Sequence, residues 1–152
     1  MPQSYIKRIL DARVYDVARE TPIDEALLMS RRLDNRVWLK REDLQPIFSF
    51  KLRGAYNKMS RLSPEKLAAG VVAASAGNHA QGVAMAAQAL NVKAIIVMPR
   101  TTPQIKVDAV RNRGARVVLH GDSFEEASEH AQQFVEEKGM TYAHPFDAVS
   151  YT

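Results

Sequence analysis

The sequence contains no cysteine, which excludes a disulfide framework, a thiolate metal site and a cysteine nucleophile. No apolar run approaches the roughly 20 residues that span a bilayer, and the start of the chain lacks the apolar core of a signal peptide. Basic and acidic residues are interspersed, with a net charge of +4, and no basic block is long enough to indicate a nucleic-acid or membrane patch. We therefore predict a cytoplasmic protein that binds neither nucleic acid nor membranes.

Glycine is also scarce: the chain has seven, and they form no run. Because neither a G-x-G-x-x-G fingerprint nor a P-loop is present, the sequence argues against a plain nucleotide-binding module. His120, His130 and His144 have no ligand spacing, so we predict no metal site. Glu42 and Asp43 are expected to cap the end of a strand rather than to transfer protons.

The part of the chain from Lys51 to Phe146 has a regular pattern. Short apolar stretches (VVAAS, KAIIVMP, ARVVLH and the start of MTYAHPFD) alternate with segments of helical spacing. Strands that alternate with helices, and that are apolar throughout, are typical of a parallel sheet buried on both faces. The predicted fold class is therefore α/β, an open parallel sheet with helices on both faces.

Several helix ends in this part carry local signals. Ser63, followed by Pro64, predicts a helix start, and Gly70 predicts its end. Ser123 and Glu126 have the spacing of a capping box. Thr102 is expected to cap the helix of TTPQIKVDAVRNRG.

The first fifty residues are less regular, and we assign them to a different layer. Helical spacing predicts a helix over residues 4–18 and a second one after the turn at Thr21 and Pro22, through residues 23–33. Alternation within residues 35–43 predicts a short strand.

The loop SAGNHAQG, residues 75–82, directly follows a predicted strand. Ligands of open parallel sheets bind beyond the carboxyl ends of the strands. The small residues Ser75 and Gly77 allow a ligand close to the backbone, and Asn78 and His79 open a helix whose free N–H groups suit a carboxylate or phosphate. The alternative is a plain strand-to-helix turn with Asn78 as its N-cap.

Lys51 lies in FSFKLRGAY, at the expected first turn of a helix. With its ordinary pKa of about 10.4, a lysine amine is a poor nucleophile at neutral pH. Apolar shielding by Phe48 and Phe50 and the nearby charge of Arg53 could lower that pKa and allow a Schiff base with an aldehyde. On these residues alone, an ordinary lysine at a helix start remains the alternative.

Three segments carry a resemblance to a known family: KREDLQP, SFKLRGAY and SAGNHAQGVA. Together they are similar to the fold-type II pyridoxal-phosphate enzymes, and within them to the threonine dehydratases of the biosynthetic type. TP at residues 21–22, IIVMP, IKVDAVR, LHG and PFD follow in the family's order and spacing. The resemblance covers nearly the whole chain.

The resemblance implies a role for each matched residue. Lys51 would hold pyridoxal 5'-phosphate as a Schiff base and act as the catalytic base, Phe50 would flank the cofactor ring, and Asn78 would bond the ring's 3′-hydroxyl. The substrate carboxylate would be bound, mostly by backbone N–H groups, at Ser75, Gly77, Asn78 and His79.

The implied reaction is the dehydration and deamination of L-threonine to 2-oxobutanoate and ammonia, the first step towards isoleucine. L-Serine would give pyruvate in the same way. The family's glycine-rich phosphate loop has no counterpart here, so we expect an N-terminal portion, inactive by itself, of an allosteric homo-oligomer that is a tetramer at full length. Residues 1–50 would belong to the large domain, residues 51–146 would form the small domain, and residues 147–152 would begin the return to the large domain.

Three alternatives stay open at this point. The same motifs occur in the catabolic threonine/serine dehydratase and in serine racemase. A folded fragment without catalytic activity that self-associates is a third reading.

Overall fold

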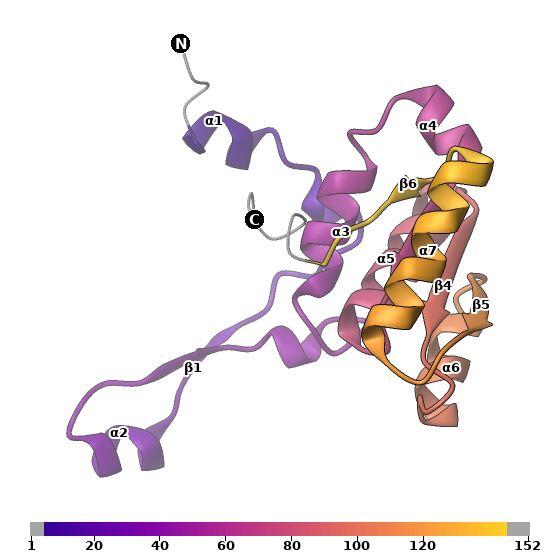
Figure 1. Cartoon of the computed structure of the whole chain (residues 1–152). Helices are drawn as coiled ribbons and strands as arrows, with labels where there is room; N and C mark the ends of the chain where they lie inside the picture. The colour runs from indigo at the N-terminus through magenta and orange to yellow at the C-terminus, as the bar shows by residue number, and fades with distance from the viewer. Residues whose placement is uncertain (1–4, 146–152) are drawn as a thin grey trace.

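The computed structural model describes residues 5–145, which form a compact α/β body and a projecting N-terminal arm (Figure 1). The body contains a four-stranded sheet in the order β5-β4-β3-β6, in which every neighbouring pair is parallel. Its strands are β3 (Val71–Ala74), β4 (Ala94–Met98), β5 (Arg116–Leu119) and β6 (Thr141–Tyr142). This architecture confirms the predicted fold class.

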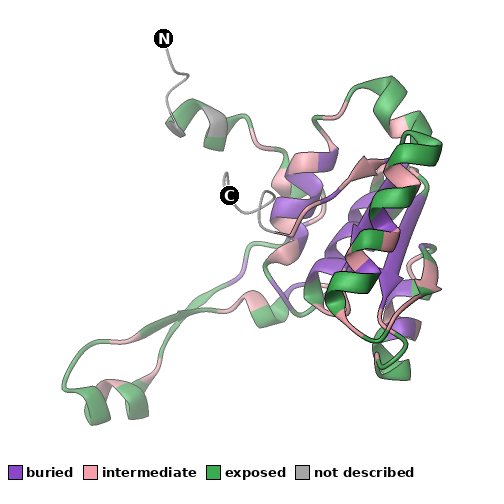
Figure 2. Cartoon of the chain, viewed as in Figure 1, coloured by how far each residue is buried: buried purple, intermediate pink, exposed green. Residues whose placement is uncertain are grey.

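Helices cover both faces of the sheet because its central strands are apolar on both sides. Val72 and Val97 pack against α7 (Phe124–Lys138), whereas Ala73 and Ile96 pack against helices on the opposite face. The central strands β3 and β4 are buried along their whole length (Figure 2). The helices on this second face are α3 (Lys51–Met59), α5 (Asn78–Leu90) and α6 (Gln104–Arg111).

Two of the helix starts follow their local signals. α4 (Pro64–Ala69) begins after Ser63, whose side chain accepts a hydrogen bond from Lys66 N–H. Ser123 and Glu126 form both bonds of a capping box at the start of α7. Both predicted caps are confirmed.

The predicted cap at Thr102 is wrong. α6 begins at Gln104 with Pro103 as its N-cap, and no side chain caps it. Thr102 Oγ1 is buried and has no hydrogen-bond partner within residues 5–145. Pro103 has a ψ of 137°, which is not helical, so the helix starts one residue later than the threonine signal suggested.

The N-terminal part departs most from the sequence-based expectation. The predicted helix over residues 4–18 is interrupted after Leu10, and Ile23–Glu25 is a strand rather than the start of a helix. That strand pairs with residues 38–40 in an antiparallel ladder, a partner that local spacing does not reveal. The elements are α1 (Tyr5–Leu10), η1 (Val14–Asp16), β1 (Ile23–Glu25), α2 (Leu27–Leu33), β2 (Trp38–Lys40) and η2 (Glu42–Leu44).

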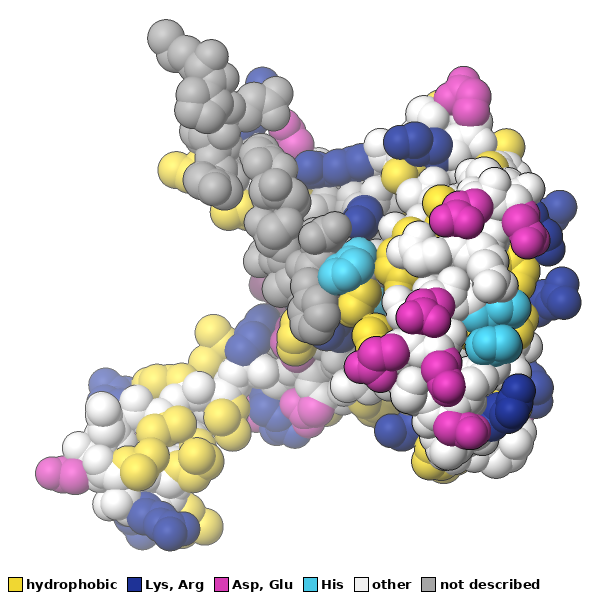
Figure 3. All heavy atoms as spheres, in the orientation of Figure 1, with side chains coloured by type: hydrophobic (Ala, Val, Ile, Leu, Met, Phe, Trp, Pro, Cys, Tyr) yellow, Lys and Arg dark blue, Asp and Glu magenta, His cyan; other side chains and the backbone are white. Residues whose placement is uncertain are grey.

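The arm formed by β1, α2 and β2 carries apolar side chains that contact little of the body. In Figure 3 they gather at the lower left, on the arm that projects from the body. Leu28 is 81% exposed and Trp38 49% exposed. An exposed apolar surface of this kind is typical of a surface that meets other protein.

No helix of residues 5–145 is long and apolar enough to cross a bilayer. In the same residues, no group of three or more His, Asp or Glu side chains could hold a metal ion. The predicted segment of residues 147–152 lies outside the described residues.

Candidate functional site

The N-terminus of α5 is open at the carboxyl edge of the sheet. β3 ends at Ala74, and the loop that follows leads to Gly77, which is the N-cap of α5 and has no side chain to close it. Asn78 is therefore the first helical residue and not the N-cap. α4 and α7, by contrast, are closed by serine side chains. Within residues 5–145 no side chain caps the first N–H groups of α5, and such groups at a helix start suit an anion.

The loop before α5 leaves room at this helix end. Gly77 N–H donates to Ser75 Oγ (3.3 Å), which holds the turn. A Cβ placed on Gly77 would meet no atom within 4 Å, so the space beside the helix end is open. Asn78 is exposed, whereas Ser75 and Gly77 are half-buried. The loop thus presents backbone and a carboxamide to a free volume.

His79 is turned into the protein. Its ring is 4% exposed, and Nε2–H donates to the carbonyl oxygen of Ala143, just after β6, at 2.8 Å. Nδ1 is buried without a partner in the described part of the chain. Burial lowers the pKa of His79, although the bond to Ala143 opposes this, so the ring is neutral at pH 7. Its backbone N–H, not its side chain, belongs to the open helix end.

The lowered pKa of His79 predicts an acid-dependent loss of stability. The unfolded chain takes up a proton at this residue below its ordinary pKa of 6.5, while the folded chain does not. This stability is present above pH 6.5 and is lost as the pH falls towards the folded-state pKa. In urea unfolding between pH 8 and 5, the His79→Gln variant should show a flatter pH dependence than the unmodified chain. The His130→Gln variant is the matched control, and an equal flattening there would contradict the assignment.

Lys51 is the first residue of α3, as the sequence predicted. Its backbone N–H donates to Ser49 Oγ (3.3 Å), and Nζ donates to the carbonyl oxygen of Pro145 at 3.4 Å. The Phe50 ring, 47% exposed, lies with its centroid 5.4 Å from Nζ. Lys51 and His79 therefore both bond to the short segment that leaves β6, which brings α3 and the start of α5 to one place.

Two of the neighbours proposed to activate Lys51 do not act on it in this structure. Phe48 is 78% exposed and gives no shielding. Arg53 pairs with Glu42, with Nε to Oε2 at 2.8 Å and side chains about equally buried. Because the carboxylate neutralises the guanidinium, Arg53 is not a free positive charge for Lys51. Phe50 is the only one of the three beside the amine.

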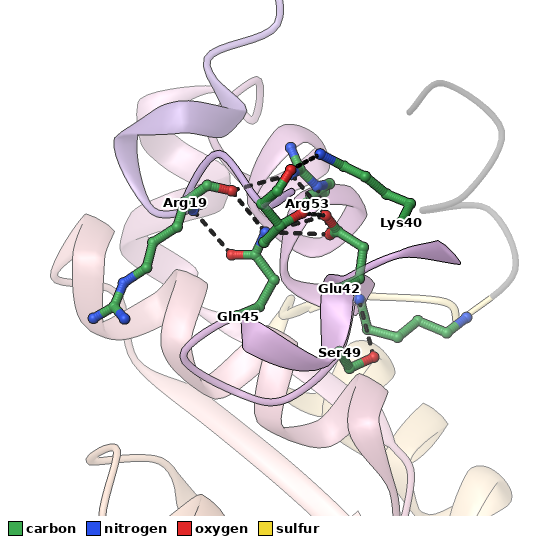
Figure 4. Close-up of polar contacts among 8 residues, drawn as sticks. Arg19, Lys40, Glu42, Gln45, Ser49 and Arg53 are labelled. Carbon is green, nitrogen blue, oxygen red and sulfur yellow. Dashed lines mark hydrogen bonds and ion pairs between the residues drawn. The ribbon is translucent and has the colours of Figure 1, made fainter. Parts of the chain in front are cut away.

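Glu42 is the centre of a polar network that the sequence did not reveal (Figure 4). Its carboxylate accepts hydrogen bonds from the Thr21 hydroxyl (2.7 Å), the Gln45 amide (3.3 Å) and both Nε and Nη2 of Arg53. These bonds lower the pKa of Glu42 to about 2, with Arg53 the largest cause. The earlier expectation of a strand cap understated its role, because the network joins the base of the arm to the first turn of α3.

Comparison with known proteins places the chain in a family. Residues 14–152 match the family model described as pyridoxal-phosphate dependent enzyme. The biosynthetic L-threonine dehydratase of Burkholderia multivorans is 58% identical over 146 residues, which are 94% of this chain and 29% of that protein. The threonine dehydratase of Nicotiana attenuata is 56% identical over 143 residues, again 94% of this chain and 24% of that protein. The chain thus spans about a quarter of the length of these relatives.

Solved structures give the same result. The processed form of threonine deaminase isoform 2 from Solanum lycopersicum superimposes with a TM-score of 0.89 at 58% identity, over 94% of this chain and 39% of that one. Maize serine racemase superimposes with a TM-score of 0.86 at 32% identity, over 92% of this chain and 43% of that one. The motifs, the fold and the matched model agree: this chain belongs to the family of pyridoxal-phosphate dependent enzymes.

Proposed function

We propose that this chain supplies the catalytic lysine and the carboxylate-binding helix end of a threonine ammonia-lyase, which converts L-threonine to 2-oxobutanoate and ammonia and L-serine to pyruvate. The observation that carries the proposal is the meeting of Lys51 with the open N-terminus of α5. Lys51 Nζ and His79 Nε2 both bond to residues 143–145, at 3.4 and 2.8 Å. These shared contacts support a site in which the Lys51 amine lies near a helix start that would bind an anion.

The residues present fit pyridoxal phosphate. The Lys51 amine, which would hold the cofactor through its aldehyde, donates a long hydrogen bond to Pro145 (3.4 Å) that a ligand can replace. The half-exposed Phe50 ring beside the amine offers an apolar surface to the cofactor ring. Asn78, exposed at the start of α5, offers an amide donor to the ring hydroxyl. When bound, the cofactor supplies a conjugated ring that draws electrons from the α-carbon of the substrate.

The chain's own residues divide the remaining work between binding and proton transfer. The N–H groups at the start of α5, with the loop from Ser75 to Gly77, would bind the substrate carboxylate at the positive end of the helix. This contact fixes the α-carbon, and the Lys51 amine removes its proton. Fixing the reacting groups in this way contributes several kcal/mol, on the order of the known effects of orientation.

A dehydratase is favoured over a racemase by the degree of similarity. Identity to the Burkholderia multivorans dehydratase is 58%, against 32% to maize serine racemase. The names of the relatives support the biosynthetic type over the catabolic one and a place in isoleucine synthesis. We extend the proposal to an allosteric, cytoplasmic homo-oligomer, a tetramer at full length.

The arm supports the proposed division of the chain into domains. We propose that residues 1–50 belong to the large domain, that residues 51–146 form the small domain, and that residues 147–152 begin the return to the large domain. β1, α2 and β2 expose large apolar side chains and lie away from the body (Figures 1 and 3). Burial of such a surface by the large domain would stabilise the whole enzyme by roughly 25 cal/mol per Å² of apolar area.

Borohydride reduction tests the function directly. The protein to use is a chimera in which this chain replaces the segment of the Burkholderia multivorans enzyme that it matches. After loading with pyridoxal phosphate and reduction, peptide mass spectrometry should find the pyridoxyl label on Lys51, and the untreated chimera should deaminate L-threonine. A folded chimera with the label on another lysine, or with neither label nor turnover, contradicts the proposal.

A further inference from the structure

α5 contains one glycine, Gly82, in a helix otherwise rich in alanine. Gly82 is buried, and a Cβ placed on it would lie 3.0 Å from the Lys51 carbonyl oxygen and 3.1 Å from its carbon. The amide nitrogen of Leu52 would be 3.4 Å away. The residue therefore gives α5 direct access to the peptide group that follows Lys51.

Glycine is favoured at residue 82 because there is little room for a side chain, and not because the backbone has an unusual conformation. Gly70 and Gly121 have φ of +91° and +65°, which favour glycine in any surroundings. Gly82 lies within a regular helix, where alanine is the better helix former. Glycine at this position costs helix stability, and what it gives in return is the close approach to Lys51.

The crowding that a side chain would cause cannot be relieved by a rotamer change, because the atoms it meets are backbone. α5 is fixed on its other side, where Val83 and Ala87 are buried in the core against the sheet. The start of α3 is less enclosed, because Lys51 and Arg53 are only half-buried. An added methyl group at residue 82 therefore moves the start of α3, and Lys51 with it, by a few tenths of an ångström.

We propose that Gly82 is a positioning residue for Lys51: the missing side chain sets the distance between the lysine backbone and α5, and thereby the reach of Nζ towards the open end of that helix. This inference rests on the proposed function, in which Lys51 removes the α-proton. It adds that α5 contributes twice to the site, by its N-terminus and by the glycine one turn further on.

The test compares Gly82→Ala with Ala89→Gly in the same chimera. Ala89 is exposed on α5, so its change to glycine weakens the helix without altering a buried side chain. For Gly82→Ala we expect kcat to fall about 10-fold, with KM for L-threonine within about twofold, because sub-ångström misplacement of reacting groups is costly. The melting temperature should change by less than about 3 °C, since helix propensity offsets the crowding.

The kinetic isotope effect distinguishes positioning from general loss of structure. With L-threonine deuterated at the α-carbon, the isotope effect on kcat should rise in Gly82→Ala, because proton removal by a displaced Lys51 becomes slower. It should be unchanged in Ala89→Gly, whose melting temperature falls while kcat stays. An unchanged isotope effect in Gly82→Ala, or a kcat loss that follows melting temperature in both variants, overturns the inference. A pyridoxyl label away from residue 51 in the unmodified chimera instead overturns the proposed function.

Discussion

Lys51→Ala should lower kcat for L-threonine at least about 1,000-fold. General-base catalysis alone contributes roughly 100- to 10,000-fold, and this residue would also hold the cofactor. Turnover is measured in the chimera from ammonia and 2-oxo acid release. The melting temperature of the cofactor-free chimera should hardly change, because the hydrogen bond from Lys51 Nζ to Pro145 is long, at 3.4 Å.

Lys51→Arg tests whether the positive charge of the side chain is sufficient for activity. The guanidinium keeps the positive charge, but it does not deprotonate in proteins and cannot form the link to the cofactor aldehyde. Its activity should be as low as that of Lys51→Ala. Lys66→Ala, at an exposed lysine of α4, is the matched control and should turn over as the unmodified protein does. Turnover by Lys51→Ala within tenfold of the unmodified protein would remove Lys51 from the mechanism.

The sequence predicted those parts of the fold in which the deciding interaction is local. Ser63 and Ser123 cap their helices through residues three positions on, and the spacing alone carries that information. The strands β3 and β4 are apolar along their length, so burial on both faces was readable as well. Ile23–Glu25 was mistaken for helix because its ladder partner, residues 38–40, lies beyond any helical window.

The candidate site shows the same division. The sequence predicted that Lys51 starts a helix and that a turn of small residues precedes α5. It did not show that the two lie near each other in the folded chain. Gly82 contacts the backbone of a residue 31 positions earlier, and no local pattern distinguishes it from a helix glycine without a role. Arg53 was assigned to Lys51 because it is near in sequence, whereas its charge is paired with Glu42. Nearness along the chain predicted the wrong partner.

Glu42→Ala should lower the free energy of unfolding by about 2–3 kcal/mol, since it leaves the largely buried guanidinium of Arg53 without its carboxylate. The same change removes the acceptor of the Thr21 hydroxyl and one acceptor of the Gln45 amide, so the base of the arm loosens from α3. Urea unfolding of this chain at pH 7 measures the loss. Asp43→Asn is the matched control: it alters the neighbouring carboxylate, whose pair with Arg41 is at the surface and contributes little.

Acid should remove the same stabilisation in the unmodified chain, and this gives the prediction a second, independent measurement. The folded-state pKa of Glu42 is about 2 and its ordinary value is 4.5, so the unfolded chain binds the proton first as the pH falls. The contribution is present above pH 4.5 and is lost between pH 4.5 and about 2. Glu42→Gln, which cannot ionise, should lose less stability than the unmodified chain between pH 5 and 3. Equal losses in the two proteins would show that the ionised Glu42 carboxylate does not contribute to stability, which contradicts its assigned role between the arm and α3.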